Sequence, residues 1–237
     1  MSSKLRYQRV LLKISGEALK GKQEYGYDPA AVDAAVARIA EARALGVQIA
    51  LVVGAGNIWR GAGGVGMDRP RADTMGMLGT MINSLGLEDA FNRAGLETVA
   101  MAAVSMDEVA EVYTSKKAKK YLSEGKVVIV GGGTGNPYFT TDTAAALRAA
   151  ELDVDVALMA KNIDGVYNAD PRKDKTAKRY DELTYGEIIE KNLRAIDLTA
   201  ASFCMDNDIK TYVFELKDPE NIYRVVKGQN VGTEIHK

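Results

Sequence analysis

The sequence predicts an α/β fold, a three-layer αβα sandwich with a mostly parallel central sheet. Short apolar segments with little polar alternation recur along the chain, as expected of strands that are covered on both faces. Helical segments separate them, and repeated strand–helix units favour a parallel sheet between two helical layers. The chain has 237 residues and no evident repeat or linker, so we expect a single domain over residues 1–237.

The expected elements follow one another in alternation. Six strands are expected, at Val10–Ser15, Gln48–Val53, Thr98–Ala103, Lys126–Val130, Val154–Ala160 and Thr211–Phe214. Four helices are expected, at Pro29–Leu45, Ala72–Ala94, Asp107–Ser123 and Ala144–Ala150. The first helix has the clearest limits, because Asp28 can cap it, Pro29 suits its first turn and Gly46 can end it. The charged stretch from Asn168 to Tyr180 is predicted to be a loop.

Composition excludes several classes of function. Hydrophobic residues make up 46% of the chain and the net charge is −1, so no overall basic field attracts nucleic acid or anionic lipid. The single cysteine, Cys204, excludes a disulfide framework and a cysteine metal cluster. The N-terminal residues lack a signal-peptide core, and no apolar run approaches the roughly 18 residues of a membrane span. We therefore expect a cytoplasmic protein without membrane or nucleic-acid partners.

The only histidine, His236, lies next to the C-terminus. Chemistry that needs a histidine base or ligand, such as Ser-His-Asp hydrolysis or a His-zinc site, is thereby excluded. Transfer of a phosphoryl group to a phosphate remains open, because an acceptor phosphate with a second pKa of about 6 is already largely ionised at neutral pH. Such a reaction needs cations and positioning more than it needs a base.

The most informative segment is Gly131–Thr143, which lies between a predicted strand and a predicted helix. Its glycines allow backbone N–H groups to turn toward an anion, and the start of the helix adds further N–H groups. Threonine hydroxyls, the Asp142 carboxylate and the faces of Tyr138 and Phe139 complete a set suited to a phosphate, a sugar and a base. The alternative is a Gly-Asn-Pro turn followed by an ordinary helix cap.

Two more strand ends carry glycines and a cation. Gly54, Ala55 and Gly56 follow the second strand, and Arg60 next to them can form a planar fork on phosphate oxygens. Lys13 stands near the end of the first strand, where α/β folds bind ligands, and Ser15-Gly16 begins a turn. The alternatives are a surface arginine at a strand-to-helix turn and a lysine held in a salt bridge.

Other motifs are weaker than they look. Gly16–Lys22 matches a P-loop except that Gln23 stands where a P-loop needs serine or threonine. Gly61–Gly66 matches a dinucleotide fingerprint but does not directly follow a strand, so we interpret it as a loop. The basic run Ser115–Lys120 has no interleaved aromatic residues and is predicted to be a solvated helix face.

Taken together, the order of these motifs resembles the amino acid kinase family, and within it the members that phosphorylate UMP. The resemblance extends from Lys13 to Thr233, and its most specific pieces are Gly54–Gly61, Asp73–Leu78, Gly133–Asp142 and Asp164–Pro171. It implies transfer of the γ-phosphoryl group of ATP to UMP, giving UDP, with Mg²⁺ as the cofactor. It also implies a role for each matching residue.

Lys13 and Arg60 should stabilise charge on the transferring group, Asp142 should orient the basic groups, and Lys161 is the candidate for a second catalytic lysine. The segment around Lys161 looks one residue shorter than in many relatives. The residues implied to bind ATP are Lys13, Ile14, Ser15, Gly16, Gly56, Arg60, Asn162, Tyr167 and Asp170. The residues implied to bind UMP are Ala55, Asp73, Thr134, Gly135, Asn136, Pro137, Tyr138, Phe139, Thr140 and Thr141. Ala55 stands where such enzymes usually have glycine, but its backbone N–H remains.

The resemblance further implies a homo-oligomer, in the family often a hexamer, with GTP and UTP as effectors to test. In some members of the family the GTP site draws on basic residues of the helix that matches Ala72–Ala94. Here that helix carries Glu88 and Asp89, which argue against activation by GTP. Two other functions stay open at this point. One is a relative that phosphorylates a carboxylate or carbamate, and the other is a non-catalytic nucleotide- or oxyanion-binding protein of the same fold.

Overall fold

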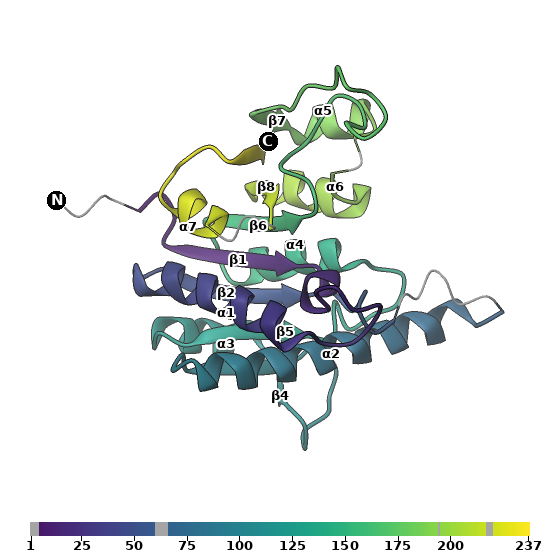
Figure 1. Ribbon diagram of the computed structural model, residues 1–237. Coiled ribbons are helices and arrows are strands. Elements are labelled where there is room, and N and C mark those ends of the chain that lie inside the picture. The colour runs from purple at the N-terminus through teal and green to yellow at the C-terminus, as the bar shows by residue number, and fades with distance from the viewer. Residues whose placement is uncertain (1–4, 60–65, 194, 217–219) are drawn as a thin grey trace.

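One central sheet organises the computed structural model, which describes residues 5–59, 66–193, 195–216 and 220–237. Within these residues the sheet has nine strands in the order β4-β3-β5-β2-β1-β6-β8-β9-β7, with β1 between β2 and β6 at its centre (Figure 1). Their bounds are β1 Arg9–Ile14, β2 Gln48–Val53, β3 Thr98–Ala102, β4 Glu111–Val112, β5 Val127–Gly131, β6 Val156–Lys161, β7 Glu182–Thr184, β8 Thr211–Glu215 and β9 Gly232–His236. Among these described strands only the β8–β9 pair is antiparallel, which confirms the mostly parallel sheet.

Helices cover both faces of this sheet, which confirms the three-layer sandwich. Their bounds are α1 Pro29–Ala44, α2 Arg69–Arg93, α3 Ser115–Ser123, α4 Thr141–Glu151, α5 Tyr185–Glu190, α6 Leu198–Asp206 and α7 Asn221–Val226, with a short 3₁₀ turn η1 at Gly16–Leu19. Helices α1, α2 and α7 contribute to one core cluster, and α3, α4, α5 and α6 contribute to the other.

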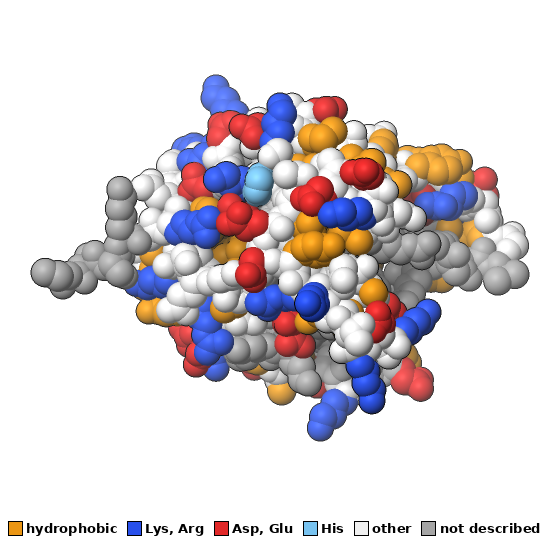
Figure 2. All heavy atoms as spheres, turned by 90° about the horizontal axis from the view of Figure 1, so that it is seen from above, with side chains coloured by type: hydrophobic (Ala, Val, Ile, Leu, Met, Phe, Trp, Pro, Cys, Tyr) orange, Lys and Arg blue, Asp and Glu red, His pale blue; other side chains and the backbone are white. Residues whose placement is uncertain are grey.

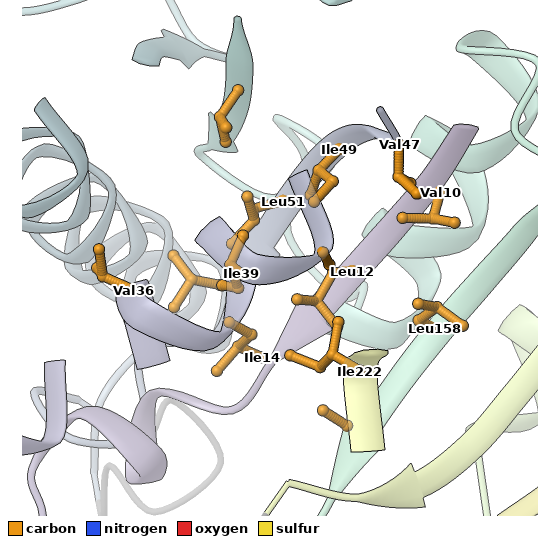
Figure 3. Close-up of a cluster of buried hydrophobic side chains, with 14 of the residues drawn as sticks. Val10, Leu12, Ile14, Val36, Ile39, Val47, Ile49, Leu51, Leu158 and Ile222 are labelled. Carbon is orange, nitrogen blue, oxygen red and sulfur yellow. The ribbon is translucent and has the colours of Figure 1, made fainter. Parts of the chain in front are cut away.

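Successive residues of each central strand enter opposite clusters. Leu12 and Ile14 of β1 pack with Ile39 of α1, as Figure 3 shows, whereas Leu11, the residue before Leu12, belongs to the other cluster, to which α4 contributes. Each such aliphatic side chain contributes about 1.5–3 kcal/mol when it is fully buried. This burial on both faces explains why the strands lack polar alternation in the sequence.

The six predicted strands are all present, with ends shifted by at most two residues. Helix α1 begins and ends as expected: Asp28 accepts a hydrogen bond from the N–H of Ala30 at 3.0 Å, and Gly46 takes a left-handed φ of 94°. The helix predicted from Asp107 is wrong over its first half. There the chain forms a turn and the short strand β4, and Thr114 caps a helix that starts only at Ser115. Strands β7 and β9 and helices α5, α6 and α7 were not predicted.

The surface agrees with the near-zero net charge. On the face seen in Figure 2, basic and acidic side chains are interspersed rather than separated by sign. In the basic run on α3, Lys117 pairs with Glu111 at 2.6 Å and Lys119 pairs with Asp153. In the part of the chain that is described, no helix is both long and apolar enough to cross a membrane.

Candidate active site

Four parallel strands deliver the candidate site residues to one edge of the sheet. The register pairs Ile14 of β1 with Val53 of β2, and Lys13 with Met159 of β6, so these strands end at nearly the same level. Strand β5 pairs with β2 in the same direction. The turns after these strands therefore meet at the carboxyl edge, the usual ligand site of open α/β sheets.

Asp142 lies between two lysines at this edge. Its Oδ1 is 2.9 Å from Lys13 Nζ and its Oδ2 is 2.7 Å from Lys161 Nζ. The side chains of Lys13 and Asp142 are only 10% and 12% exposed, so these charges are largely withdrawn from water. The cluster carries two positive charges and one negative charge, and its excess positive charge suits a phosphate group.

Burial and charge act in opposite directions on the pKa of these groups. Burial disfavours ionised Asp142, but the adjacent Lys13 and Lys161 outweigh it and hold the pKa of this carboxyl below its usual value. For Lys161, burial together with repulsion from Lys13 outweighs Asp142 and lowers the pKa of the ammonium. The carboxylate therefore stays ionised at neutral pH and keeps both lysines in place.

The first turn of α4 positions Asp142. Thr140 caps this helix by accepting hydrogen bonds from the N–H groups of Asp142 and Thr143 at 3.1 and 3.2 Å. Asp197, itself the cap of α6, accepts hydrogen bonds from the hydroxyls of Thr140 and Thr143. Asp197 thus fixes the segment that carries Asp142, although nothing in the sequence singled it out.

The glycine turns after β1 and β2 approach each other closely. A Cβ atom on Gly16 would lie 2.4 Å from the carbonyl oxygen of Gly54 and 2.9 Å from the amide nitrogen of Gly56. Only glycine fits such an approach of backbone to backbone. The residues of the incomplete P-loop match do not form such a loop, because Gly16–Leu19 forms a 3₁₀ turn and Lys22 is exposed.

A pocket of about 250 Å³ opens between these turns, α2 and the segment after β5. Its lining includes eight residues that the resemblance assigns to nucleotide binding, which are Ala55, Gly56, Asp73, Thr134, Asn136, Phe139, Thr140 and Thr141. It also includes five residues that were not predicted, which are Trp59, Gly76, Met77, Thr80 and Gly133. Thr80 accepts a hydrogen bond from the N–H of Gly132 at 2.8 Å, which attaches the glycine-rich segment Gly131–Thr143 to α2.

Asp73 lines this pocket and contacts Tyr138, which is not among the residues that line it. The Oδ2 atom of Asp73 accepts hydrogen bonds from the backbone N–H of Tyr138 at 2.9 Å and from Arg69 at 2.8 Å. Tyr138 has a left-handed φ of 73°, a conformation that costs a non-glycine residue about 1–2 kcal/mol. Gly135 and Pro137 belong to the same segment, although neither is among the residues that line the pocket.

Arg148 holds the segment Gly131–Thr143 through a hydrogen bond to its backbone. This arginine is 4% exposed, donates to the carbonyl of Gly133 at 3.1 Å, pairs with Glu151 at 2.7 Å and stacks on Tyr113. It is a second positioning group that the sequence did not reveal, because Gly133 and Tyr113 lie outside α4, the helix that carries Arg148.

A second pocket, of about 470 Å³, lies between α1, α7 and the ends of β6 and β8. Ile14 and Asn162, both assigned to ATP, line it together with Glu215. The pKa of Tyr167 is raised chiefly by the hydrogen bond that its hydroxyl donates to Asp164, and also by the negative charge of Glu215. Asp170 lies further along the same loop and accepts a hydrogen bond from the N–H of Arg172 at 3.0 Å.

The structure thus gathers Lys13, Asp142 and Lys161 at one point. Arg60, assigned to catalysis and to ATP, and most of the Gly61–Gly66 loop lie outside the described residues. No group of three His, Cys, Asp or Glu side chains suited to a metal ion occurs among the residues that are described.

Comparison with known proteins defines the class. The model of the amino acid kinase family matches residues 8–215, and the chain belongs to this family. Similar solved structures include a UMP kinase from Bacillus anthracis, with 36% identity, a TM-score of 0.94 and coverage of 97% of this chain and 96% of that one. A UMP kinase from Ureaplasma parvum has 37% identity, a TM-score of 0.92 and coverage of 98% and 100%. A uridylate kinase from Archaeoglobus fulgidus has 32% identity, a TM-score of 0.73 and coverage of 95% and 99%.

Proposed function

We propose that this protein transfers the γ-phosphoryl group of ATP to the phosphate of UMP, forming UDP and ADP. The observation that carries the proposal is the position of the Lys13–Asp142–Lys161 cluster beside the pocket that contains Asp73 and the glycine-rich segment. The likeness to three UMP kinases over nearly the whole chain supports the same reaction. It also favours a kinase over a non-catalytic binding protein.

In this reaction an oxygen of the UMP phosphate attacks the γ-phosphorus, and the bond from that phosphorus to the β–γ bridging oxygen breaks. The acceptor is already ionised, so no base is required. Lys13 and Lys161 stabilise negative charge on the transferring group and the leaving ADP, and we assign Arg60 the same role. Asp142 holds the two ammonium groups in place, so their positions do not have to be organised during the reaction.

The two substrates take opposite sides of the cluster. UMP occupies the 250 Å³ pocket, with its phosphate on the N–H of Ala55, its ribose on Asp73 and its base along Thr134–Thr141. ATP places its phosphates on Ser15, Gly16 and Gly56 and its adenosine beside Asn162, Tyr167 and Asp170. Both sets of phosphates then reach Lys13 and Lys161 together.

Mg²⁺ enters this scheme as a companion of ATP. Magnesium commonly binds through substrate phosphates and one or two carboxylates, keeping several waters. The described residues offer no acidic cluster for it, and Asp142 is engaged by two lysines. We therefore assign the ion to the ATP phosphates and name no protein ligand for it.

We further propose a homo-oligomer that uses α2 as a contact. Met75, Leu78 and Ile82 on this helix are 36%, 48% and 53% exposed, and their spacing places them on one face. Sedimentation analysis tests the assembly, because Ile82→Arg should lower the sedimenting mass. A hexamer is the size that the family resemblance implies. The effect of GTP or UTP on the rate of UDP formation is measured on the same preparation.

A coupled assay for ADP release tests the reaction, with ATP, Mg²⁺ and one acceptor at a time: UMP, CMP, dUMP, glutamate or aspartate. Turnover with UMP in preference to the other acceptors is the expected result. Turnover with an amino acid alone would identify a carboxylate kinase instead. Binding of UMP without turnover of any acceptor would identify a non-catalytic protein.

A further inference from the structure

Asn57 and Asn83 form a reciprocal amide pair beneath the glycine turn that follows β2. The Nδ2 of Asn57 donates to Oδ1 of Asn83 at 3.0 Å, and the Nδ2 of Asn83 donates to Oδ1 of Asn57 at 2.8 Å. The two residues are 2% and 0% exposed. Buried amide groups must form their hydrogen bonds within the protein, and each of these two side chains donates one hydrogen bond to the other.

The second hydrogen of each amide binds a backbone carbonyl on another segment. Asn83, on α2, donates to the carbonyl oxygen of Gly54 at 2.6 Å. The side chain of Asn57 donates to the carbonyl oxygen of Gly26 at 3.0 Å, and the backbone carbonyl of Asn57 accepts a hydrogen bond from the N–H of Gly26 at 2.8 Å. The Oδ1 of Asn57 also lies 2.4 Å from the position of a Cβ on Gly16. The pair thus connects α2 with the turns after β1 and β2.

The bond to Gly54 determines the direction of an N–H group. A trans peptide is planar, so the N–H of Ala55 points opposite to the carbonyl of Gly54. By holding that carbonyl, Asn83 fixes the orientation of the Ala55 N–H, and Ala55 lines the 250 Å³ pocket. Apolar side chains could fill the same volume, but they could not hold this peptide in one orientation.

We propose that Asn57 and Asn83 are positioning residues for phosphate binding, which set the Ala55 N–H group at a fixed place relative to α2 and Asp73. This inference rests on the proposed function, in which that N–H group binds the UMP phosphate. It adds two residues that touch neither substrate and act through the backbone between them.

The test compares ligands with and without a phosphate. In Asn83→Ala, kcat should fall about 10- to 100-fold, the loss expected when a binding group is displaced by about 1 Å. Affinity for UMP should fall about tenfold in direct titration, whereas affinity for uridine should change less than about twofold, because only the phosphate contacts are displaced. Asn57→Ala should behave alike, and the double variant should lose less than the two single losses combined, because each single change already breaks the pair.

Tyr185→Phe is the matched control. Its hydroxyl is buried in the other core cluster and donates to the carbonyl of Ile209 at 2.7 Å, so its removal also orphans a buried carbonyl. This variant should lower Tm without the selective loss of UMP affinity. If Asn83→Ala does not fold at the assay temperature, Asn83→Ser, which keeps a donor, takes its place.

Two results would overturn the inference. An Asn83 variant that lowers Tm but keeps kcat and UMP affinity, as Tyr185→Phe should, would show that the pair is only structural. Equal losses for uridine and UMP would show general damage to the pocket. Asp73→Ala, measured alongside, separates these failures from failure of the site itself, since an unchanged KM for UMP in that variant would refute the assignment of the pocket.

Discussion

Lys161 Nζ lies 2.7 Å from Oδ2 of Asp142, and this contact joins the end of β6 to the first turn of α4. Together with Lys13 on β1, it brings three elements that are distant in the sequence to one charged centre. A single carboxylate therefore determines where both ammonium groups stand before any substrate arrives. Such preorganisation is the main means by which enzymes accelerate phosphoryl transfer.

The lowered pKa of Lys161 predicts an early alkaline limb in the pH profile. The ammonium stabilises the transferring group only while it is protonated, so kcat should decline as pH rises through a pKa below the ordinary lysine value of about 10.4. In Lys161→Arg the guanidinium stays charged, so the limb should move to higher pH. Profiles of kcat for the two proteins provide the comparison, and identical limbs would assign the titration to another group.

Asp73→Ala should chiefly raise the KM for UMP, because the carboxylate is expected to bind the ribose. The change also removes the partner of Arg69 and of the Tyr138 N–H. Arg69→Ala breaks the ion pair but leaves the carboxylate, so its KM should stay close to that of the wild type. A rise of similar size in both variants would mean that the ion pair, rather than contact with the ribose, accounts for the effect.

Gly16→Ala should abolish most activity, because the new Cβ would lie 2.4 Å from the Gly54 carbonyl oxygen and must displace one of the two turns. A displacement of about 1 Å in a binding turn can cost about a hundredfold in rate. Gly186→Ala is the control, since its Cβ would meet only the Thr184 hydroxyl oxygen at 3.8 Å. Steady-state rates and Tm for both variants decide the point, and an active Gly16→Ala protein would contradict the close packing of the turns.

The sequence was most informative where one segment carries its own signal. The buried strands, the cap of α1 and the glycine turns are local patterns, and they led to Lys13, Ala55, Gly56 and Asp142. The residues that hold these site residues in place could not be predicted in this way. Asn83, Arg148 and Asp197 act through partners on other elements, and no spacing in the sequence indicates those contacts.

The misassigned helix has a related cause. Residues from Asp107 to Thr114 carry no proline or glycine to break a helix, so the pattern favoured one continuous element. In the folded chain Glu111 and Val112 instead pair with β3 at the edge of the sheet, and Thr114 provides the cap from which α3 begins. Tertiary pairing outweighed local preference over these residues.

Transfer of ³²P from γ-labelled ATP to UMP tests the central claim most directly, measured for the wild type and for Lys13→Ala at saturating substrates. The account predicts labelled UDP from the wild type. It predicts a kcat lower by about 100- to 1,000-fold in Lys13→Ala, with a much smaller change in UMP affinity, because Lys13 acts mainly on charge in the transition state. Equal losses of turnover and UMP affinity, or transfer at the wild-type rate without Lys13, would contradict the role of the Lys13–Asp142–Lys161 cluster.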